Sequence, residues 1–305
     1  MSTDLQNGVA TQLSPTVFLL DDTLIVVRHL SGLRRWPSAK RLIYVIDDDW
    51  RAGLRDAALP FGYRAKLALR EARQARYLER RADVILCSSD FLKGHLQLRW
   101  PNKTIRTLEP AWPRASSPLP AERPKRVACL SAATHRADFA FIKPILDAAL
   151  SELHIHLTVT ANAPVPGSWK DRPDVTIVPV MTWQSYRNWM MTEHFDIGLY
   201  PTCGTPFNAA RSGNKLLEYD QFGAALICSS SWHAGTAAAK EGRCITCPDH
   251  HIEWQHALKA LVENLGKANS IASANRRALA REDPLISQRK RWLEILERDL
   301  PLTTG

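Results

Sequence analysis

FDIGLYPTCGTPFNAARSGNKLLEYDQFGAALICS, residues 195–229, is the stretch that decides the fold. It begins with an apolar run at 195–200 and ends with a second at 225–229, and both runs are typical of buried strands. Between them a loop leads to a helical pattern that begins near Ser212, and Gly223 is typical of the residue just past a helix end. The stretch therefore predicts a strand, a loop, a helix and a second strand.

Charged residues gather where this predicted helix begins. Arg211 lies in the loop, and Lys215 and Glu218 lie about one turn apart, so the two can share a helix face. A helix N-terminus offers unpaired N–H groups and partial positive charge, which suit a phosphate group. Glu218 lies one turn deeper, where its carboxylate can accept hydrogen bonds from sugar hydroxyls. The pattern predicts a binding site for a nucleotide diphosphate.

The same motifs resemble the donor-binding half of GT-B glycosyltransferases: Asp-Ile-Gly-Leu-x-Pro, Pro-Phe-Asn, Ser-x-x-Lys-x-x-Glu-Tyr and Gly-Ala. The resemblance implies that Ser212 and Lys215 hold the donor diphosphate and that Glu218 holds the ribose. It extends the donor-binding set to three more residues of this segment: Asn208, Gly213 and Asn214. Ala210 stands where many retaining members carry a second glutamate, which leaves the sugar and the stereochemistry open.

The N-terminal part of the chain alternates short apolar runs with longer helical patterns. Strands are expected at 16–20, 23–27, 41–46 and 83–88, with a charged helix at 62–81 and another that starts at Ser89 or Asp90. This alternation predicts a parallel α/β sheet. The pattern restarts after a proline-rich segment at 113–124, so we expect an N-terminal domain over 1–112, a linker over 113–124 and a C-terminal domain over 125–280.

The resemblance covers this whole arrangement and implies an α/β fold of two Rossmann-like domains that face a cleft. Segment 82–92 resembles the last strand and turn of the family's N-terminal domain, and 127–141 resembles the first strand and loop of its C-terminal domain. Thr134 and His135 would then line the donor site. The N-terminal domain is shortened by this comparison, and a helix within 281–305 could return to it.

Three consecutive carboxylates, Asp47, Asp48 and Asp49, follow the apolar run at 41–46. They could be a loop of solvated carboxylates or a helix N-cap before Trp50. They could also be a metal site, or a catalytic or acceptor-orienting group, because parallel sheets bind ligands at the carboxyl ends of their strands. Mutual repulsion is expected to raise the pKa of at least one of them. The run also resembles an IDDD motif of bacterial surface-polysaccharide glycosyltransferases. Arg51 disfavours a haloacid-type phosphatase, and 46 preceding residues are too few for a GT-A nucleotide-binding subdomain.

The net charge of +9 is concentrated in one part of the chain. Residues 28–125 carry 21 Lys and Arg against 10 Asp and Glu, which predicts an anionic partner. A glycan, a glycolipid or another anionic acceptor is favoured, and the basic helix at 64–81 makes an anionic membrane surface a candidate. No nucleic-acid-binding motif is present. Six dispersed cysteines and the polar N-terminus predict a cytoplasmic protein, at most peripheral on the inner face of the membrane.

These features together predict a metal-independent glycosyltransferase that uses a nucleotide sugar as substrate and needs no cofactor. Asp47, Asp48, Asp49, Arg211 and Lys215 are the expected catalytic residues. The alternatives are a noncatalytic glycosyltransferase-like binding subunit and a nucleotide-sugar hydrolase or epimerase, since one fold hosts several chemistries. Cys244 and Cys247, although near three histidines, are expected to be strand residues and not zinc ligands.

Overall fold

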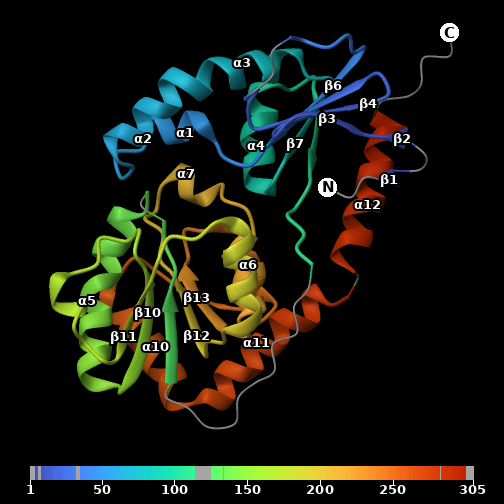
Figure 1. The fold of residues 1–305 in the computed structure, drawn as a ribbon. Coiled ribbons are helices and arrows are strands. Elements are labelled where there is room, and N and C mark those ends of the chain that lie inside the picture. Colours follow the sequence, from blue (N-terminus) through green and yellow to red (C-terminus); the bar gives the residue numbers. More distant parts are fainter. Residues whose placement is uncertain are drawn as a thin grey trace.

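The computed structural model describes residues 4–5, 8–31, 35–113, 125–132, 134–281 and 283–299. These residues form two α/β domains, each built on a six-stranded sheet. Figure 1 shows the N-terminal domain above the C-terminal domain, with the chain crossing between them near its middle and again near its C-terminus. A separate pair of short antiparallel strands, β1 (Asp4–Leu5) and β2 (Gly8–Val9), lies at the N-terminus.

The sheet of the N-terminal domain has the strand order β3-β4-β5-β6-β7-β8. The strands are β3 (Thr11–Ser14), β4 (Val17–Leu20), β5 (Thr23–Val27), β6 (Arg41–Ile46), β7 (Val84–Cys87) and β8 (Thr104–Thr107). Strands β5 to β8 are parallel, as predicted.

The prediction of a parallel sheet is wrong at its β3 edge, because β3 pairs antiparallel with β4 and β4 pairs antiparallel with β5. Only Asp21 and Asp22 separate β4 from β5, and Asp21 has a φ of 50°. A two-residue connection can make a hairpin but cannot cross over to a parallel neighbour, which needs a dozen residues or more.

Helices follow the parallel strands of this domain. They are α1 (Trp50–Arg55), α2 (Phe61–Lys66), α3 (Ala72–Arg81) and α4 (Asp90–Arg99). The helix predicted at 62–81 is interrupted by a π-helical turn at Leu67–Glu71. The predicted start of α4 is confirmed, because Ser89 is its N-cap and its hydroxyl accepts a hydrogen bond from the backbone N–H of Leu92.

The C-terminal sheet is parallel throughout, with the order β11-β10-β9-β12-β13-β14. Its strands are β9 (Lys125–Cys129), β10 (Ile155–Thr160), β11 (Val175–Val178), β12 (Ile197–Tyr200), β13 (Ala225–Ser229) and β14 (Ile245–Cys247). Its helices are α5 (Arg136–Glu152), α6 (Trp183–Thr192), α7 (Pro206–Ala209), α8 (Asn214–Gln221), α9 (His233–Lys240), α10 (His251–Glu263) and α11 (Leu265–Leu279).

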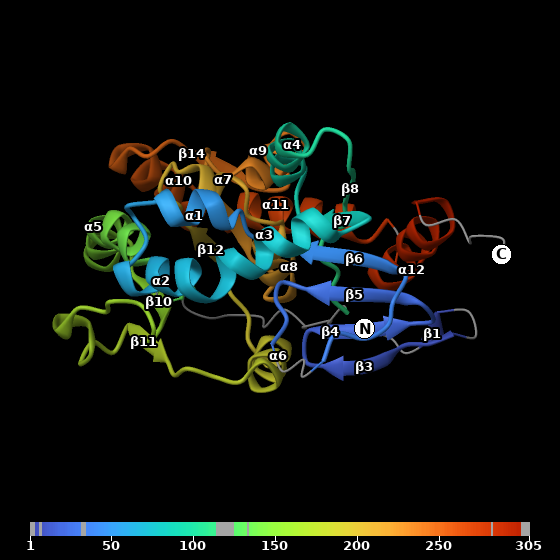
Figure 2. The same cartoon turned by 90° about the horizontal axis from the view of Figure 1, so that it is seen from above.

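The two domains meet through α1 and α7, which lie next to each other in both views (Figures 1 and 2). An added Cβ at Gly53 of α1 would lie 3.0 Å from the Phe207 ring of α7, so glycine permits this close approach. The Thr205 hydroxyl donates to Asp56 at 2.6 Å, beside this contact. The Ser89 hydroxyl, after β7, donates to the carbonyl of Ala210 at 2.7 Å. Segments that follow the carboxyl ends of both sheets therefore meet at one junction.

The last helix, α12 (Pro284–Glu294), lies against the N-terminal domain. Trp292 and Ile295 join a buried cluster on its sheet with Leu20, Ile25, Ile43, Val84 and Leu86. Figure 1 shows α12 beside the strands of that domain, far from α10 and α5. Among the described residues, every helix is too short or too polar to cross a membrane.

Candidate functional site

The segment that was expected to bind a diphosphate lies at the start of α8. The helix begins at Asn214 with Gly213 as its N-cap, two residues later than the predicted start near Ser212. Ser212 and Gly213 are half-buried and Asn214 is exposed. Strand β12 leads into this segment, and Gly198 in that strand lets the Tyr219 ring of α8 pack against its backbone, where a Cβ would lie 2.1 Å from the ring. This packing fixes α8 on the sheet.

Lys215 and Glu218 form an ion pair on one face of α8. The Lys215 ammonium lies 2.8 Å from Glu218 Oε2 and donates to the carbonyl of Leu130 at 2.8 Å. The Tyr186 hydroxyl of α6 donates to Glu218 Oε1 at 2.6 Å. Burial and the charge of Glu218 raise the pKa of Tyr186, so this tyrosine stays protonated as a donor. Lys215 and Glu218 are therefore held in fixed positions beside the loop that follows β9.

Arg211 lies just before α8 and is held from two sides. Its Nε donates to Asn208 Oδ1 at 3.0 Å, and its guanidinium lies 5.0 Å from the centre of the Phe207 ring. Asn208 in turn donates to the carbonyl of Cys203 at 3.0 Å. Asn208, predicted to bind the donor, thus holds the arginine in place.

His135 lies at the end of the loop after β9 and is buried beside Asp138. The two side chains are 2.6 Å apart, from His135 Nδ1 to Asp138 Oδ2. Burial lowers the pKa of His135, with Arg211 and Lys215 adding to the effect, and the Asp138 hydrogen bond opposes it without reversing it. A neutral ring that donates from Nδ1 to a carboxylate has Nε2 as an acceptor. Thr134, beside it, is half-buried.

Asp47 and Asp48 of the N-terminal domain share one arginine. Arg28 Nε lies 3.1 Å from Asp47, and Arg28 Nη2 lies 2.8 Å from Asp48. Burial and the charge of Asp48 raise the pKa of Asp47 to about 6, against the opposing effect of Arg28. The Asp47 side chain is 40% exposed, so solvent screens part of this effect. The predicted elevation of one carboxylate pKa is found at Asp47.

Asp49 differs from its two neighbours because its carboxylate is buried and caps a helix. Its Oδ1 accepts from the backbone N–H groups of Arg51 and Ala52, which makes it the N-cap of α1. Its Oδ2 lies 3.0 Å from His95 Nδ1, and the side chain is only 4% exposed. The three consecutive aspartates thus divide into a helix cap, Asp49, and a pair of carboxylates, Asp47 and Asp48, that share Arg28.

The two half-sites face each other across the junction. Burial lowers the pKa of Arg211, but Tyr200, Asp48 and Asp138 together outweigh it and raise the pKa above its ordinary value, so the N-terminal carboxylate of Asp48 lies within electrostatic reach of this C-terminal arginine. Burial and the charge of Asp48 raise the pKa of Tyr63 in α2, against the opposing charges of Arg28 and Arg211. Asp48 of the N-terminal domain and Arg211 of the C-terminal domain are thus near enough for their charges to interact.

Four residues of this site were missed by the sequence reasoning: Arg28, Tyr63, Asp138 and Tyr186. Arg28 offers a backbone signal in the structure, because its φ of 65° is unusual for a residue other than glycine and such conformations concentrate at functional sites. Asp138 could have been suspected from its three-residue spacing to His135. Tyr63 and Tyr186 reach the site only through the tertiary fold.

No group of three or more His, Cys, Asp or Glu side chains is placed to hold a metal ion within the part of the chain that the structure describes. Cys244 and Cys247 are both buried, and they belong to different core clusters, so they do not face one another. Neither residue lies in the interdomain site.

Comparison with solved structures identifies the fold. A TarM mutant from S. aureus, in complex with fondaparinux, alpha-GlcNAc-glycerol and UDP, is 10% identical with a TM-score of 0.63, and the match covers 88% of this chain and 52% of that one. Sucrose-phosphate synthase from Thermosynechococcus elongatus is 12% identical with a TM-score of 0.63, over 90% of this chain and 72% of that one. WaaG, a glycosyltransferase involved in lipopolysaccharide biosynthesis, is 14% identical with a TM-score of 0.61, over 85% and 78%.

The chain therefore has the GT-B fold, with two sheets of six strands that carry the expected α/β arrangement. It spans about half the length of TarM. No protein-family model matches the sequence, and no curated protein matches it.

Proposed function

We propose that this protein transfers a sugar from a nucleotide-sugar donor to an anionic glycan or lipid-linked acceptor. The observation that carries the proposal is the arrangement across the interdomain junction. Arg211 and Lys215 lie at the start of α8 in one domain, and the Asp47–Asp48 pair lies within electrostatic reach of Arg211 in the other. The GT-B fold of the chain, shared with a TarM structure that contains UDP, supports a nucleotide-bearing donor.

The donor diphosphate would lie at the N-terminus of α8, near Ser212, Gly213 and Asn214. The departing diphosphate gains negative charge in the transition state, and preorganised cations and N–H dipoles stabilise such charge. Arg211 is held by Asn208, and Lys215 is held by Glu218 and the Leu130 carbonyl, so neither needs to reorganise as the bond breaks. The protein would then need no metal ion for this step.

Glu218 would hold the ribose of the donor. Its carboxylate already accepts from Tyr186 and Lys215, but an ionised carboxylate has about four lone-pair sites for hydrogen bonds. His135 would face the transferred sugar, where Nε2 accepts a hydroxyl hydrogen bond, and Thr134 would lie beside it.

Asp47 is the acceptor-side group. If the reaction inverts the anomeric centre, Asp47 removes the proton of the attacking hydroxyl, and its pKa of about 6 leaves it mostly ionised near neutral pH. If the reaction retains configuration, the leaving phosphate accepts that proton and Asp47 orients the acceptor. Asp48 and Arg28 set the charge around Asp47 in either case.

The acceptor side also carries an exposed basic face. Lys66, Arg70, Arg73 and Arg76 are exposed along α2, the π-helical turn and α3. Leu69 is 83% exposed among them. This face suits a peripheral contact with an anionic bilayer in the cytoplasm, where each basic residue near the surface adds about 1 kcal/mol of attraction. Sedimentation with anionic vesicles, and its absence with neutral ones, would support this contact.

Release of nucleoside diphosphate tests the function. UDP-glucose and related nucleotide sugars are incubated with the purified protein, with and without a fraction of glycan or lipid-linked acceptors. Release that requires the acceptor supports transfer. Release without acceptor supports a nucleotide-sugar hydrolase, and a changed sugar without release supports an epimerase. Saturable nucleotide binding without any reaction supports a noncatalytic binding subunit. EDTA should leave transfer unchanged.

A further inference from the structure

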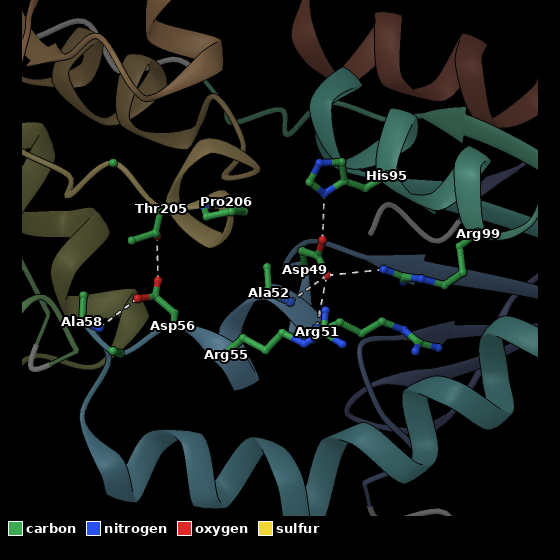
Figure 3. Close-up of a pocket in the computed structure, with 12 residues that line it drawn as sticks. Asp49, Arg51, Ala52, Arg55, Asp56, Ala58, His95, Arg99, Thr205 and Pro206 are labelled. Atoms are coloured by element: carbon green, nitrogen blue, oxygen red, sulfur yellow. Dashed lines mark hydrogen bonds and ion pairs between the residues drawn. The ribbon is translucent and has the colours of Figure 1, made fainter.

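A cavity lies at the domain junction, bounded by α1, α4 and the segment that leads into α7. Its volume is about 720 Å³, within the range of sites that hold whole small molecules. Arg51 and Arg55 line it from α1, and His95 and Arg99 line it from α4. Gly204, Thr205 and Pro206 close it from the C-terminal domain. We name it the junction pocket. Figure 3 shows His95 and Arg99 directed from α4 toward Asp49 at the start of α1.

The carboxylates at and behind the pocket accept their short hydrogen bonds from groups other than arginine. Asp49 caps α1 and contacts His95. Asp56 accepts from the backbone N–H of Ala58 at 2.9 Å and from the Thr205 hydroxyl at 2.6 Å. Glu79, fully buried behind the pocket, accepts from the Trp50 ring N–H at 2.7 Å. It accepts a second ring N–H from Trp100.

The N–H donors of the pocket arginines are therefore only partly used. Arg51 and Arg99 each lie 3.5 Å from Glu79, and Arg99 lies 3.9 Å from Asp49, all longer than a charge-assisted hydrogen bond. Arg51 Nε is buried without a hydrogen-bond partner in the described structure. Arg55 is exposed at the pocket, and within the described residues it forms no ion pair. A guanidinium has five N–H donors, so most of the donor capacity of this group is open.

Like charges also crowd one another here. Burial lowers the pKa of Arg99, and Arg51 and Arg55 lower it further, against the opposing charges of Glu79 and Asp49. An anion between the three guanidiniums would reduce this repulsion and accept hydrogen bonds from their unused N–H groups. Arginine clusters suit phosphate because their planar N–H pairs match its oxygens.

We propose that the junction pocket binds a phosphate group carried on a small molecule, through Arg51, Arg55 and Arg99. The pocket is distinct from the proposed donor site, because its lining residues include none of those proposed to hold the donor, which lie at the start of α8 and in the loop after β9. Its walls come from both domains, so the bound molecule also strengthens their association.

Calorimetry with inorganic phosphate and glucose 6-phosphate on the full chain tests the proposal. Arg55→Gln, at an exposed position, should weaken binding by about tenfold or more, the effect of losing a charged hydrogen-bond donor. Arg99→Gln should do the same if thermal unfolding shows it folded. Arg73→Gln, an exposed arginine outside the pocket, is the matched control and should bind as the wild type does. Lys215→Ala, in the donor site, should also keep the affinity.

Unchanged affinity in Arg55→Gln and folded Arg99→Gln would overturn the proposal, as would the absence of saturable binding to the wild type. Loss in Lys215→Ala alone would also overturn it, since phosphate would then occupy the donor site. None of these results depends on the proposed transferase activity. If binding to the pocket is confirmed, mass analysis of glucose 6-phosphate after incubation with the protein and UDP-glucose distinguishes two roles for the bound molecule. A glycosylated probe supports an acceptor, and an unchanged probe supports an effector.

Discussion

Asp47 has a pKa raised well above its ordinary value, to about 6. Its neighbours Asp48 and Arg28 act in opposite directions, and burial with Asp48 prevails. The sequence placed three carboxylates at the end of a strand but could not separate their roles, because Asp49 becomes a cap only when α1 begins at Trp50. The separation depends on His95 and Arg28, which are distant in sequence.

The raised pKa of Asp47 makes a prediction about stability. Between its ordinary value of 3.8 and about 6, the folded state binds more protons than the unfolded state, so this group lowers stability as pH rises. Asn does not titrate. The unfolding free energy of Asp47→Asn relative to wild type should therefore be highest near about pH 7 and fall toward about pH 4. Urea denaturation at several pH values measures it, and a difference that does not vary with pH would contradict the assigned shift.

Glu218 makes a prediction about the donor. Glu218→Gln keeps the shape but removes the charge that would accept ribose hydroxyls and balance Lys215. Donor affinity should fall by about tenfold or more, since a hydrogen bond to a charged group contributes about 1.5–3 kcal/mol. Calorimetry with UDP measures the effect. Tyr186→Phe, which removes one donor to the same carboxylate, is the control and should cost less. Equal affinity in Glu218→Gln and wild type would remove Glu218 from the ribose site.

At the scale of the elements, local signals predicted most of the fold. Strands β5 and β13 have the predicted bounds, and Ser89 caps α4 as its side chain indicated. Short elements were missed, including β3, α7 and α9, because four to eight residues give little periodicity. The π-helical turn between α2 and α3 has no sequence signal that distinguishes it from a helix. The segment before α8 that is proposed to bind the donor could be singled out from the sequence because its residues lie close together in it.

The packing of α8 on β12 makes a prediction that contrasts two glycines. A Cβ at Gly198 would lie 2.1 Å from the Tyr219 ring, whose hydroxyl bonds to the backbone of β9 and β12. Gly198→Ala should destabilise the protein by about 1–3 kcal/mol through overpacking. A Cβ added at Gly94 in α4 would meet no neighbouring atom within 4 Å, so Gly94→Ala should stabilise the protein by about 0.5–1 kcal/mol. Chemical denaturation checks both, and a neutral Gly198→Ala would show that Tyr219 can move.

At the scale of the whole molecule, α12 joins the C-terminal end of the chain to the N-terminal domain. Trp292 is buried against Leu20, Ile25 and Ile43, and Gln288 donates to the carbonyl of Glu109 at 3.2 Å. The family resemblance implied that a terminal helix could return to the N-terminal domain, but its exact position on that sheet depends on which apolar faces remain uncovered after both sheets form. That information is spread over the whole chain.

This packing predicts a large effect for one distant side chain. Trp292→Ala should cost about 3–5 kcal/mol of stability, the usual cost of removing a buried tryptophan. Leu285→Ala in the same helix is the control, because Leu285 is 50% exposed, and it should change stability by less than about 0.5 kcal/mol. Thermal and urea unfolding compare the two variants. Similar small losses in both would show that α12 contributes little to the N-terminal domain.

The central claim is that the donor is held by the C-terminal domain while Asp47 acts from the N-terminal domain across the cleft. Asp47→Asn tests it most directly when turnover and donor affinity are measured on the same protein. The account predicts that acceptor-dependent release of nucleoside diphosphate falls by about 10²–10⁴ with donor affinity unchanged, because general-base assistance is lost and donor contacts are not. Near-normal release in Asp47→Asn, or a loss explained entirely by weaker donor binding, would contradict it.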